Sequence, residues 1–442
     1  MLKIFDLSMR LNGFPLAAAK DALSEIVAVP ENSYADFIDS KKQEIVNFHL
    51  QHNSFYRNLN KDAFTSWNDV PVMTKSDYQR PLRERLSDGF SDKDVYVNKT
   101  SGSGGHPMVF AKDKMCHAMI WANIARKFAW YQIDLNTSLQ ARFYGRPLEF
   151  LADKKLRFKD WLSSRYRFDI FDLSDTAMAE VVRLFSEKKF EYINGYTTVI
   201  VALAHYLRKS NLVLSQLCPT LKVCITTSEM LFESDKKLLE ERLGVPVVNE
   251  YGASELDIIA FEDPEGRWLV NAENLFVEIL DDQNQRVKDG IEGRIVVTAL
   301  HNKAHPFIRY DVGDYGVLDP VSTAKKPILQ RLTGRTNDFA ILPSGKKPAG
   351  MTFYSITKAL FDDNANVGEF VITQTMTDTF VIDYTSTVSL TAAETSHIEK
   401  VLSDYLEPGL TFVFNRHDAL QRTKSGKLKQ FTSLVTENPA NR

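Results

Sequence analysis

The sequence predicts an α/β protein with two domains. The first is a large N-terminal domain with mixed or parallel sheets and a small β-barrel-like part, and the second is a small C-terminal α+β domain. Between residues 139 and 249, short β-rich segments alternate with helical segments of ten or more residues, which is typical of crossover units and parallel sheet. From Trp268 onward, β segments follow one another closely, which favours antiparallel sheet or a small barrel. A chain of 442 residues is also too long for one ordinary domain.

Composition and charge narrow the class of protein. The chain has 44% hydrophobic and 25% charged residues, as soluble globular proteins do. Its formal net charge of −3 creates no global field that would favour nucleic acid or an anionic membrane. We therefore expect neither a nucleic-acid partner nor a membrane partner.

The N-terminus and the cysteines indicate a cytoplasmic protein. The first residues are mildly apolar but include Lys3, Asp6 and Arg10, so they lack the continuous apolar core of a signal peptide. No run approaches the ~18–20 apolar residues that a membrane span needs. Three cysteines form no C-x-x-C pair, and we expect them to be buried reduced thiols: Cys116, Cys218 and Cys224.

Residues 1–90 are expected to be helical. Apolar positions between residues 33 and 60 fit one amphipathic helix, which we expect to end within residues 52–57. Thr74, with Asp77 three residues on, is a good N-cap for a short helix. Residues 95–110 indicate strand, loop and strand, and residues 113–133 indicate a helix.

The remaining elements follow from the same patterns. Strands are expected over 139–143, 190–195, 221–226 and 245–249, and helices over 176–189, 197–209 and 234–243. The close-spaced β segments cover 274–280, 293–300 and 306–318. A polar stretch at 334–338 is the predicted boundary, so the domains cover 1–334 and 335–442. In the second domain we expect helices over 351–361 and 391–405 and strands over 369–375, 379–384 and 411–414.

A glycine-rich loop joins the first two predicted strands. Glycines let consecutive N–H groups turn toward one point and hydroxyls add donors, so such a loop suits a phosphate. It is not a P-loop, because His106 and Pro107 stand where that motif requires a lysine and a hydroxyl. A flexible surface hairpin is the alternative. The loop consists of Thr100, Ser101, Gly102, Ser103, Gly104 and Gly105.

A second motif, NEYGASE at residues 249–255, follows a predicted buried strand. Its side chains therefore emerge at the carboxyl end of that strand, where α/β sheets bind ligands. Tyr251 offers a flat face to a base, Ser254 can donate to a phosphate, and Glu255 can bind Mg²⁺ through oxygen. A helix start with a glycine turn is the alternative.

Three further motifs follow. In RYDVGD (309–314), Asp314 can accept from both hydroxyls of a ribose, although Asp and Gly are also ordinary in β-turns. In GRTND (334–338), Arg335 can reach ribose or phosphate. In RTKSGK (422–427), Lys427 can bring a positive charge to a phosphate-bearing reaction centre, although such a run is usually a solvated basic tail.

In this order, the five motifs resemble those of the adenylate-forming superfamily of acyl-CoA synthetases. TSGSGGHP resembles its phosphate loop, EYGASE its Y-G-x-S/T-E motif, RYDVGD its T-G-D motif, GRTND its G-R-x-D-D hinge and QRTKSGK its catalytic-lysine motif. HNSFYRN and DVPVMTKSD are similar to segments of phenylacetate-CoA ligases and CapK-type proteins. The resemblance covers residues 45–435. The chain departs from the family pattern at Gly104, His106, Val312 and Asn337, but it keeps Glu255, Asp314 and Lys427.

The resemblance implies an AMP-forming acyl-CoA ligase, similar to phenylacetate-CoA ligase. A carboxylic acid attacks the α-phosphate of ATP to give acyl-AMP and pyrophosphate, and coenzyme A then displaces AMP. ATP, Mg²⁺ and coenzyme A are the implied cofactors. The small C-terminal domain is implied to be mobile and to rotate at residues 337–338, carrying Lys427 away after the first half.

The resemblance also implies roles for individual residues. Residues 100–105 hold the β- and γ-phosphates, and Lys427 bridges the carboxylate and the α-phosphate. Glu255 binds Mg²⁺. The remaining nucleotide contacts are Ser228, Glu229, Tyr251 and Gly252 around the adenine, Ser254 at the α-phosphate, and Asp314 and Arg335 at the ribose.

The acyl pocket is expected near the ends of three predicted strands. Its aromatic residues would suit an aryl or other flat small acid, unless they are simply core. The expected residues are Tyr144, Asn194, Gly195, Tyr196 and Ala253.

Alternative functions remain at this stage. One is an adenylating enzyme that transfers an acyl or aminoacyl group to a carrier protein or a sugar amine in capsule or secondary metabolism. Another is a non-catalytic nucleotide-binding member, which Gly104 and Asn337 would permit. The sequence leaves open the acid, the acceptor and the oligomeric state, for which a homodimer is one arrangement that it allows.

Overall fold

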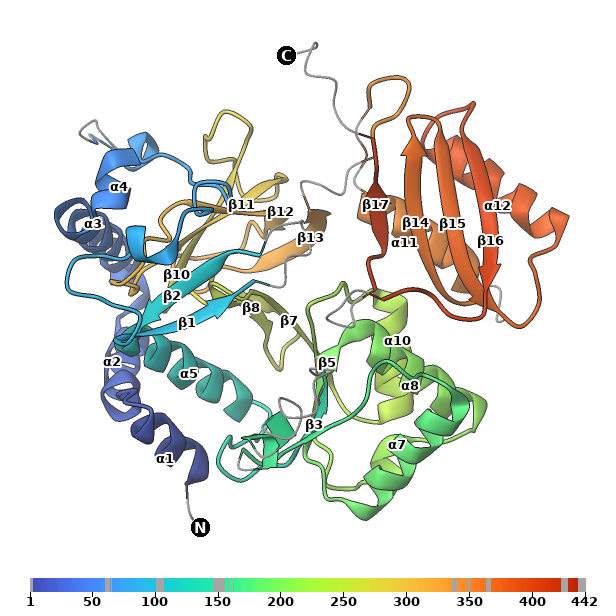
Figure 1. Cartoon of the computed structure of the whole chain (residues 1–442), viewed down its shortest axis with the longest axis horizontal. Helices are drawn as coiled ribbons and strands as arrows, with labels where there is room; N and C mark the ends of the chain where they lie inside the picture. The colour runs from blue at the N-terminus through green and yellow to red at the C-terminus, as the bar shows by residue number, and fades with distance from the viewer. Residues whose placement is uncertain are drawn as a thin grey trace. The chain divides into compact units, whose positions relative to one another are not determined.

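The computed structural model describes residues 3–59, 64, 66–100, 107–145, 156–157, 159–161, 163–335, 340–346, 348, 350–362, 367–422 and 428–435. The chain divides into two compact units (Figure 1). One comprises Met1–Val312 and Gly316–Arg331, and the other comprises Gly313–Tyr315 and Leu332–Arg442. The boundary expected at Gly334 lies inside strand β13 (Leu329–Arg335) and stays a prediction.

The first unit is built on a seven-stranded mixed sheet with the order β4-β3-β5-β6-β7-β8-β9. The five strands from β4 to β7 are parallel, as the alternation of strands and helices predicts. Strands β8 and β9 are antiparallel, because only residues 254–256 connect β7 to β8 and a parallel crossover needs a dozen or more. The strands are β3 (Gln140–Phe143), β4 (Arg165–Arg167), β5 (Tyr192–Tyr196), β6 (Val223–Thr227), β7 (Val247–Ala253), β8 (Asp257–Glu262) and β9 (Trp268–Val270).

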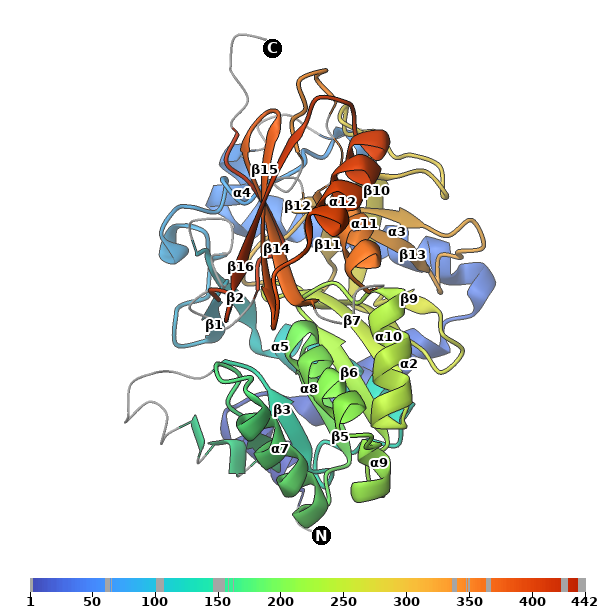
Figure 2. The same cartoon turned by 90° about the vertical axis from the view of Figure 1, so that its right-hand side faces the viewer.

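Helices cover both faces of this sheet. Helices α7 (Asp175–Glu187), α8 (Thr197–Lys209) and α10 (Glu233–Leu243) share one core with the sheet and lie on the same face of it (Figure 2). Helix α5 (Lys114–Ala129) packs Phe128 into a second core with residues of β6, β7 and β8. Strand β6 is consequently buried along its whole length, as its run VCITT indicates.

The N-terminal helices pack beside the second sheet of this unit. They are α1 (Ile4–Leu11), α2 (Leu16–Ala28), α3 (Tyr34–His52) and α4 (Ser54–Leu59). Short 3₁₀ turns lie at η1 (Glu31–Ser33), η2 (Trp67–Asp69) and η3 (Leu82–Glu84). A further short helix of this unit, α9 (Leu214–Leu217), lies between α8 and β6 in the sequence. The helix that was expected to end within residues 52–57 does so: α3 ends at His52, and the backbone of Asn53 is extended while its side chain donates to Arg85 O and Ser87 Oγ. The short helix expected from Thr74 is wrong: the Asp77 carboxylate accepts from the Thr74 N–H at 2.7 Å and closes a single turn.

The second sheet is a curled half-barrel with the order β10-β11-β12-β13. Its strands are β10 (Leu275–Leu280), β11 (Gly293–Ala299), β12 (Tyr310–Leu318) and β13. A separate hairpin pairs β1 (Val95–Lys99) with β2 (Val109–Asp113), which confirms the predicted strands on either side of the glycine-rich loop.

The second unit contains a four-stranded mixed sheet with the order β16-β15-β14-β17. The elements are α11 (Gly350–Asp362), β14 (Val367–Met376), β15 (Thr379–Ser386), α12 (Ala392–Tyr405), β16 (Thr411–His417) and β17 (Phe431–Ser433). Helix α12 begins with a capping box between Thr391 and Glu394. The α/β fold class is thereby confirmed.

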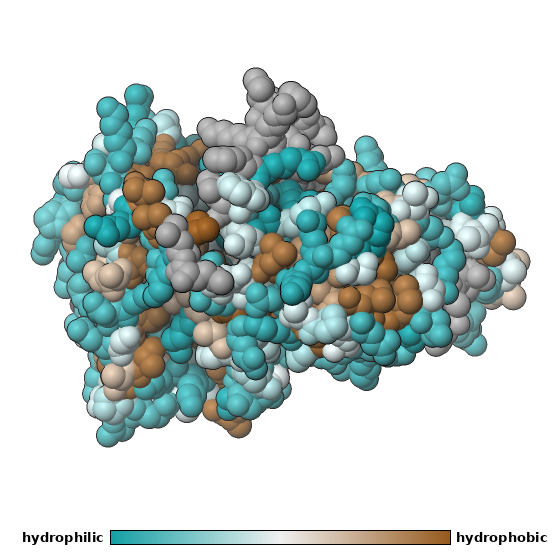
Figure 3. All heavy atoms as spheres, turned by 90° about the horizontal axis from the view of Figure 1, so that it is seen from below, coloured by the Kyte–Doolittle hydropathy of each residue, from teal (hydrophilic) through white to brown (hydrophobic). Residues whose placement is uncertain are grey.

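The last feature of the fold is how apolar residues are distributed over its surface and its helices. On the face in Figure 3, hydrophilic residues surround separate small groups of hydrophobic ones. None of the helices in the described ranges is both long enough and apolar enough to cross a membrane.

Candidate functional site

The base of the glycine-rich loop is closed by Thr100. Its N–H donates to Met108 O at 2.9 Å, and its Oγ1 accepts from the Met108 N–H at 3.0 Å. This pair continues the β1–β2 ladder by one step and fixes both ends of the loop. The other predicted loop residues, Ser101, Gly102, Ser103, Gly104 and Gly105, lie outside the described residues.

The EYGASE motif forms the tight turn between β7 and β8. A Cβ on Gly252 would lie 2.4 Å from Asp257 O, so only glycine permits this approach of the two strands. Asp257 itself has a left-handed backbone with φ 59°. Ala253 ends β7, Ser254 is exposed at the turn, and Glu255 is only 8% exposed. The motif therefore has a structural reason for its glycine and presents one buried carboxylate.

Glu255 is held by a residue from another motif. The hydroxyl of Tyr310, in RYDVGD, donates to Glu255 Oε1 at 2.9 Å. Burial and the Glu255 charge raise the pKa of Tyr310 above its usual value, so the hydroxyl keeps its proton. The backbone around Tyr310 also pairs with Met73 of the DVPVMTKSD segment. The Met73 N–H donates to Arg309 O, and the Asp311 N–H donates to Met73 O. Three sequence motifs thus meet around one carboxylate.

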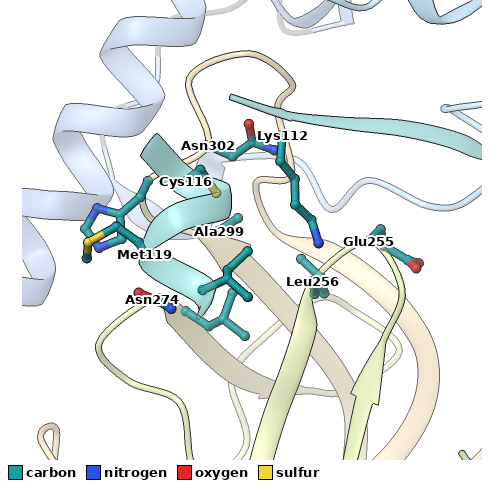
Figure 4. A pocket seen from close by; sticks show the side chains of 11 residues that line it. Lys112, Cys116, Met119, Glu255, Leu256, Asn274, Ala299 and Asn302 are labelled. Atoms are coloured by element: carbon teal, nitrogen blue, oxygen red, sulfur yellow. The ribbon is translucent and has the colours of Figure 1, made fainter. Parts of the chain in front are cut away.

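Lys112 is a further residue of this site, and it belongs to none of the five sequence motifs. Its side chain is 2% exposed and reaches from β2 toward the turn that carries Glu255 and Leu256 (Figure 4). Its Nζ donates to Ser254 O at 3.2 Å and forms an ion pair with Asp257. Lys112 therefore joins the strand after the glycine-rich loop to the EYGASE turn. The one sequence feature that could have indicated its role is that this lysine directly follows an apolar run, Met108 to Ala111.

A cavity of about 10 Å³ lies beside Lys112 and Glu255. It has room for about one water molecule and none for a nucleotide. Its lining residues come from β2, α5, the EYGASE turn and the half-barrel: Lys112, Cys116, Met119, Ile120, Glu255, Leu256, Asn274, Leu275, Ala299, His301 and Asn302.

The residues predicted around the adenine have mixed surroundings. Ser228 is exposed and has a left-handed backbone with φ 71°, a strained conformation that is common at functional sites. The Glu229 carboxylate accepts from the N–H and the hydroxyl of Thr198, both at 2.9 Å, and so satisfies donors at the start of α8. Tyr251 is 8% exposed, with its ring 6.0 Å from that of Trp268. Their nucleotide contacts stay predictions.

Two further predicted residues lie in the half-barrel strands. Asp314 is in β12 and follows Gly313, whose φ is 80°. Arg335 is the last residue of β13. Lys427 and the expected hinge at residues 337–338 lie outside the described residues.

Four of the five predicted acyl residues lie together near the carboxyl ends of the neighbouring parallel strands β3 and β5. The Tyr144 hydroxyl donates to Asn194 Oδ1 at 3.0 Å, and the rings of Tyr144 and Tyr196 are 5.0 Å apart. A Cβ on Gly195 would lie 2.4 Å from Phe143 O, so this glycine is required by the pairing of β3 with β5. Ala253 ends β7, two strands away from β5 in the sheet.

The site offers Mg²⁺ one carboxylate. Within the part of the chain that the structure describes, no three His, Cys, Asp or Glu side chains gather in a group that could hold a metal. A single carboxylate such as Glu255 fits Mg²⁺ nevertheless, because this ion usually takes one or two carboxylates and completes its shell with water and substrate phosphates.

Comparison with known proteins finds distant relatives. No protein-family model matches the chain. It is 24% identical to Protein CapK of Staphylococcus aureus over 330 residues, which cover 70% of this chain and 69% of CapK. It is 30% identical to a phenylacetate-coenzyme A ligase of Aromatoleum evansii over 131 residues, 28% of this chain and 29% of the ligase.

The fold has close counterparts among solved structures. One is a 2-hydroxyisobutyryl-CoA ligase in the postadenylation state in complex with 2-HIB-AMP. The match has a TM-score of 0.69 at 18% identity and covers 92% of this chain and 90% of that one.

Proposed function

Because the chain belongs to the adenylate-forming acyl-CoA ligase superfamily, we propose that it is an ATP-dependent acid–thiol ligase. It adenylates a small carboxylic acid with release of pyrophosphate and then transfers the acyl group to coenzyme A, as a phenylacetate-CoA ligase does. ATP, Mg²⁺ and coenzyme A are its proposed cofactors.

The observation that carries this proposal is the meeting of separate motifs at Glu255. The Tyr310 hydroxyl holds the carboxylate, and Lys112 holds the turn through Ser254 O. These contacts fix the orientation of the carboxylate before any ligand binds, and preorganised charges need no rearrangement during a reaction. Of these residues, Glu255, Ser254 and Tyr310 belong to the motifs in which the sequence resembles adenylating enzymes.

Both halves of the reaction build negative charge at phosphorus or at a carbonyl oxygen. Bound Mg²⁺ would supply positive charge to the phosphates, with Glu255 as its protein ligand. Ser254, exposed at the turn, can donate to the α-phosphate. Thr100 to Gly105 would hold the β- and γ-phosphates, Ser228, Glu229, Tyr251 and Gly252 the adenine, and Asp314 and Arg335 the ribose. Lys427 would bridge the attacking carboxylate and the α-phosphate. Rotation at residues 337–338 would then remove it.

The test is pyrophosphate release from a panel of carboxylic acids, with and without coenzyme A, for the wild type and Lys427→Ala. We expect Lys427→Ala to slow adenylation by ~10²–10³ or more, the effect of losing one preorganised charge or donor. Thioester formation from supplied acyl-AMP should remain. An equal loss in both halves would contradict the role of Lys427 in the first half alone.

A second candidate is supported by the longer of the two alignments, which is to Protein CapK and not to a CoA ligase. In this case the enzyme would form acyl-AMP but pass the acyl or aminoacyl group to a carrier protein or a sugar amine. Pyrophosphate release without any coenzyme A thioester would favour it. A non-catalytic nucleotide-binding member would bind ATP and release no pyrophosphate with any acid.

A further inference from the structure

Three arginines lie on the two strands that begin the main sheet. Arg142 is on β3, and Arg165 and Arg167 are on β4. The two strands are parallel, with Gln140 opposite Arg165 and Arg142 opposite Arg167. Among the described residues, only Arg167 of the three has an anionic partner.

Arg167 is neutralised within the protein. Its Nε and Nη2 donate to the two carboxylate oxygens of Asp160 at 2.7 and 3.2 Å, and its Nη1 donates to Gly145 O. Both side chains are at most 10% exposed. This two-point pairing is the usual way in which a protein stabilises a buried guanidinium.

Arg142 has no such partner in the described ranges. Its Nη1 makes one long hydrogen bond of 3.4 Å to Gln140 Oε1, and its guanidinium lies 4.2 Å from the centre of the Tyr144 ring. Its Nε is buried without a hydrogen bond, and so is the Nε of Arg165. Neither arginine forms an ion pair with any carboxylate in the described part of the chain. Burial lowers the pKa of Arg142 to about 10, which still leaves it charged at neutral pH.

The polar neighbours of Arg142 do not supply the missing charge. Asn194 Oδ1 accepts from Tyr144 and from Gln140 Nε2, so that oxygen already has two donors. Two acidic groups lie within electrostatic range of Arg142: Asp160, which is already paired with Arg167, and Glu250 on β7. Burial raises the pKa of Glu250 to about 7, against a hydrogen bond from Thr227, so at neutral pH it carries only part of a negative charge.

Arg142 is partly buried, and a charge held partly out of water without a counter-ion is costly unless a ligand supplies the anion. Arginine is the side chain suited to this role, because its planar donors match the oxygens of a carboxylate, phosphate or sulfonate. Arg142 lies two residues before Tyr144 and opposite Asn194 in the β3–β5 register. It is therefore within the residues proposed to bind the acid.

We propose that the acid carries a second anionic group, which pairs with Arg142. Arg165, on the neighbouring strand β4, adds positive electrostatic potential beside Arg142. The inference rests on the proposed ligase function, since that function assigns the acid to these strand ends. It also revises the expectation of a simple aryl acid: a flat ring fits beside Tyr144 and Tyr196, but it should bear a carboxylate, sulfonate or phosphate away from the reacting carboxyl group.

The experiment compares acids that differ only in the second charge. Terephthalate and 4-sulfobenzoate are paired with 4-methylbenzoate, and glutarate with its monomethyl ester, in the pyrophosphate-release assay. We expect the doubly charged member to have a kcat/KM at least ~10-fold higher, because a hydrogen-bonded charge pair is worth about this factor or more. Arg142→Gln should abolish the preference by lowering kcat/KM for the doubly charged acids alone. Arg142→Lys should restore part of it.

Arg167→Gln is the matched control, because it removes an arginine of the same region that already has a protein partner. It should lower the melting temperature and leave the preference unchanged. Thermal shift with terephthalate and with 4-methylbenzoate, on wild type and Arg142→Gln, gives a readout that needs no turnover.

The outcomes separate the two proposals. If no acid releases pyrophosphate, the ligase function fails, and the binding readout still decides the role of Arg142. If pyrophosphate is released but neutral acids are used as well as charged ones, or folded Arg142→Gln keeps the preference, the role of Arg142 is wrong and the ligase function stands.

Discussion

Glu255 combines a structural contact with a charge, and the two can be separated. Its Oε1 accepts from Tyr310, while its negative charge is what a hard cation requires. Glutamine keeps the size and an acceptor oxygen but loses the charge. We therefore expect Glu255→Gln to weaken the use of Mg²⁺-ATP with little change in melting temperature, measured as pyrophosphate release against Mg²⁺ concentration.

Tyr310→Phe is the companion variant, because it removes the hydroxyl and keeps the carboxylate. A large fall in melting temperature for Glu255→Gln, with normal Mg²⁺ dependence, would show that the glutamate is structural.

Single residues could be predicted where a motif named them and not otherwise. Glu255, Tyr251 and Ser254 were found by their position after a strand. Lys112 could not be found in this way, because its partner Asp257 is 145 positions away and only the folded chain brings them together. The sequence also could not show that the Glu229 carboxylate accepts from Thr198.

At the scale of elements, long periodic segments were predictable and short edge strands were not. Helix α8 was predicted with its observed bounds. Helix α10 begins one residue before the predicted start and ends at Leu243, because the left-handed backbone of Gly244 terminates it. The sequence pattern missed four edge strands, β4, β9, β13 and β17, and the inner strand β8. Strand β4 has three residues, too few for a period, and β8 forms by antiparallel return across the EYGASE turn.

The pairing of β3 with β5 gives a prediction for Gly195→Ala. The added Cβ would lie 2.4 Å from Phe143 O and 2.5 Å from Phe143 Cβ, so two central strands would have to separate. We expect a loss of about 1–3 kcal/mol of unfolding free energy, the usual cost of overpacking, measured by urea denaturation without ligand.

Gly368→Ala is the control for this prediction. Its nearest atom is Thr385 Oγ1 at 3.0 Å, which also accepts from the Glu369 N–H, so a small shift of one side-chain atom accommodates the added Cβ and we expect a smaller loss than for Gly195→Ala. An unchanged stability of Gly195→Ala would instead favour a role for this glycine in binding alone.

At the scale of the whole molecule, each of the two units has its own apolar core. In the second unit, Phe380 is fully buried, with ring contacts to Phe353 at 4.8 Å and Phe412 at 5.8 Å. We expect Phe380→Ala to cost about 3–5 kcal/mol and to accelerate hydrogen exchange in the second unit alone.

Phe143→Ala, in the sheet of the first unit, is the reciprocal variant. Hydrogen exchange measured by mass spectrometry distinguishes local from global effects. Equal acceleration in both units for either variant would mean that the two cores unfold as one.

The packing of the N-terminal helices sets an order of events during synthesis of the chain. His49, on α3, donates to Asn302 O, 253 positions later, and Tyr34 donates to Ala272 O. At about 5–20 residues per second, a ribosome needs about 10–50 s to deliver these partners. During that time α1, α2 and α3 lack the half-barrel residues with which they share a core, Ala272 and Leu300 among them. Their apolar faces are then open to chaperones, and to aggregation, until the half-barrel has emerged.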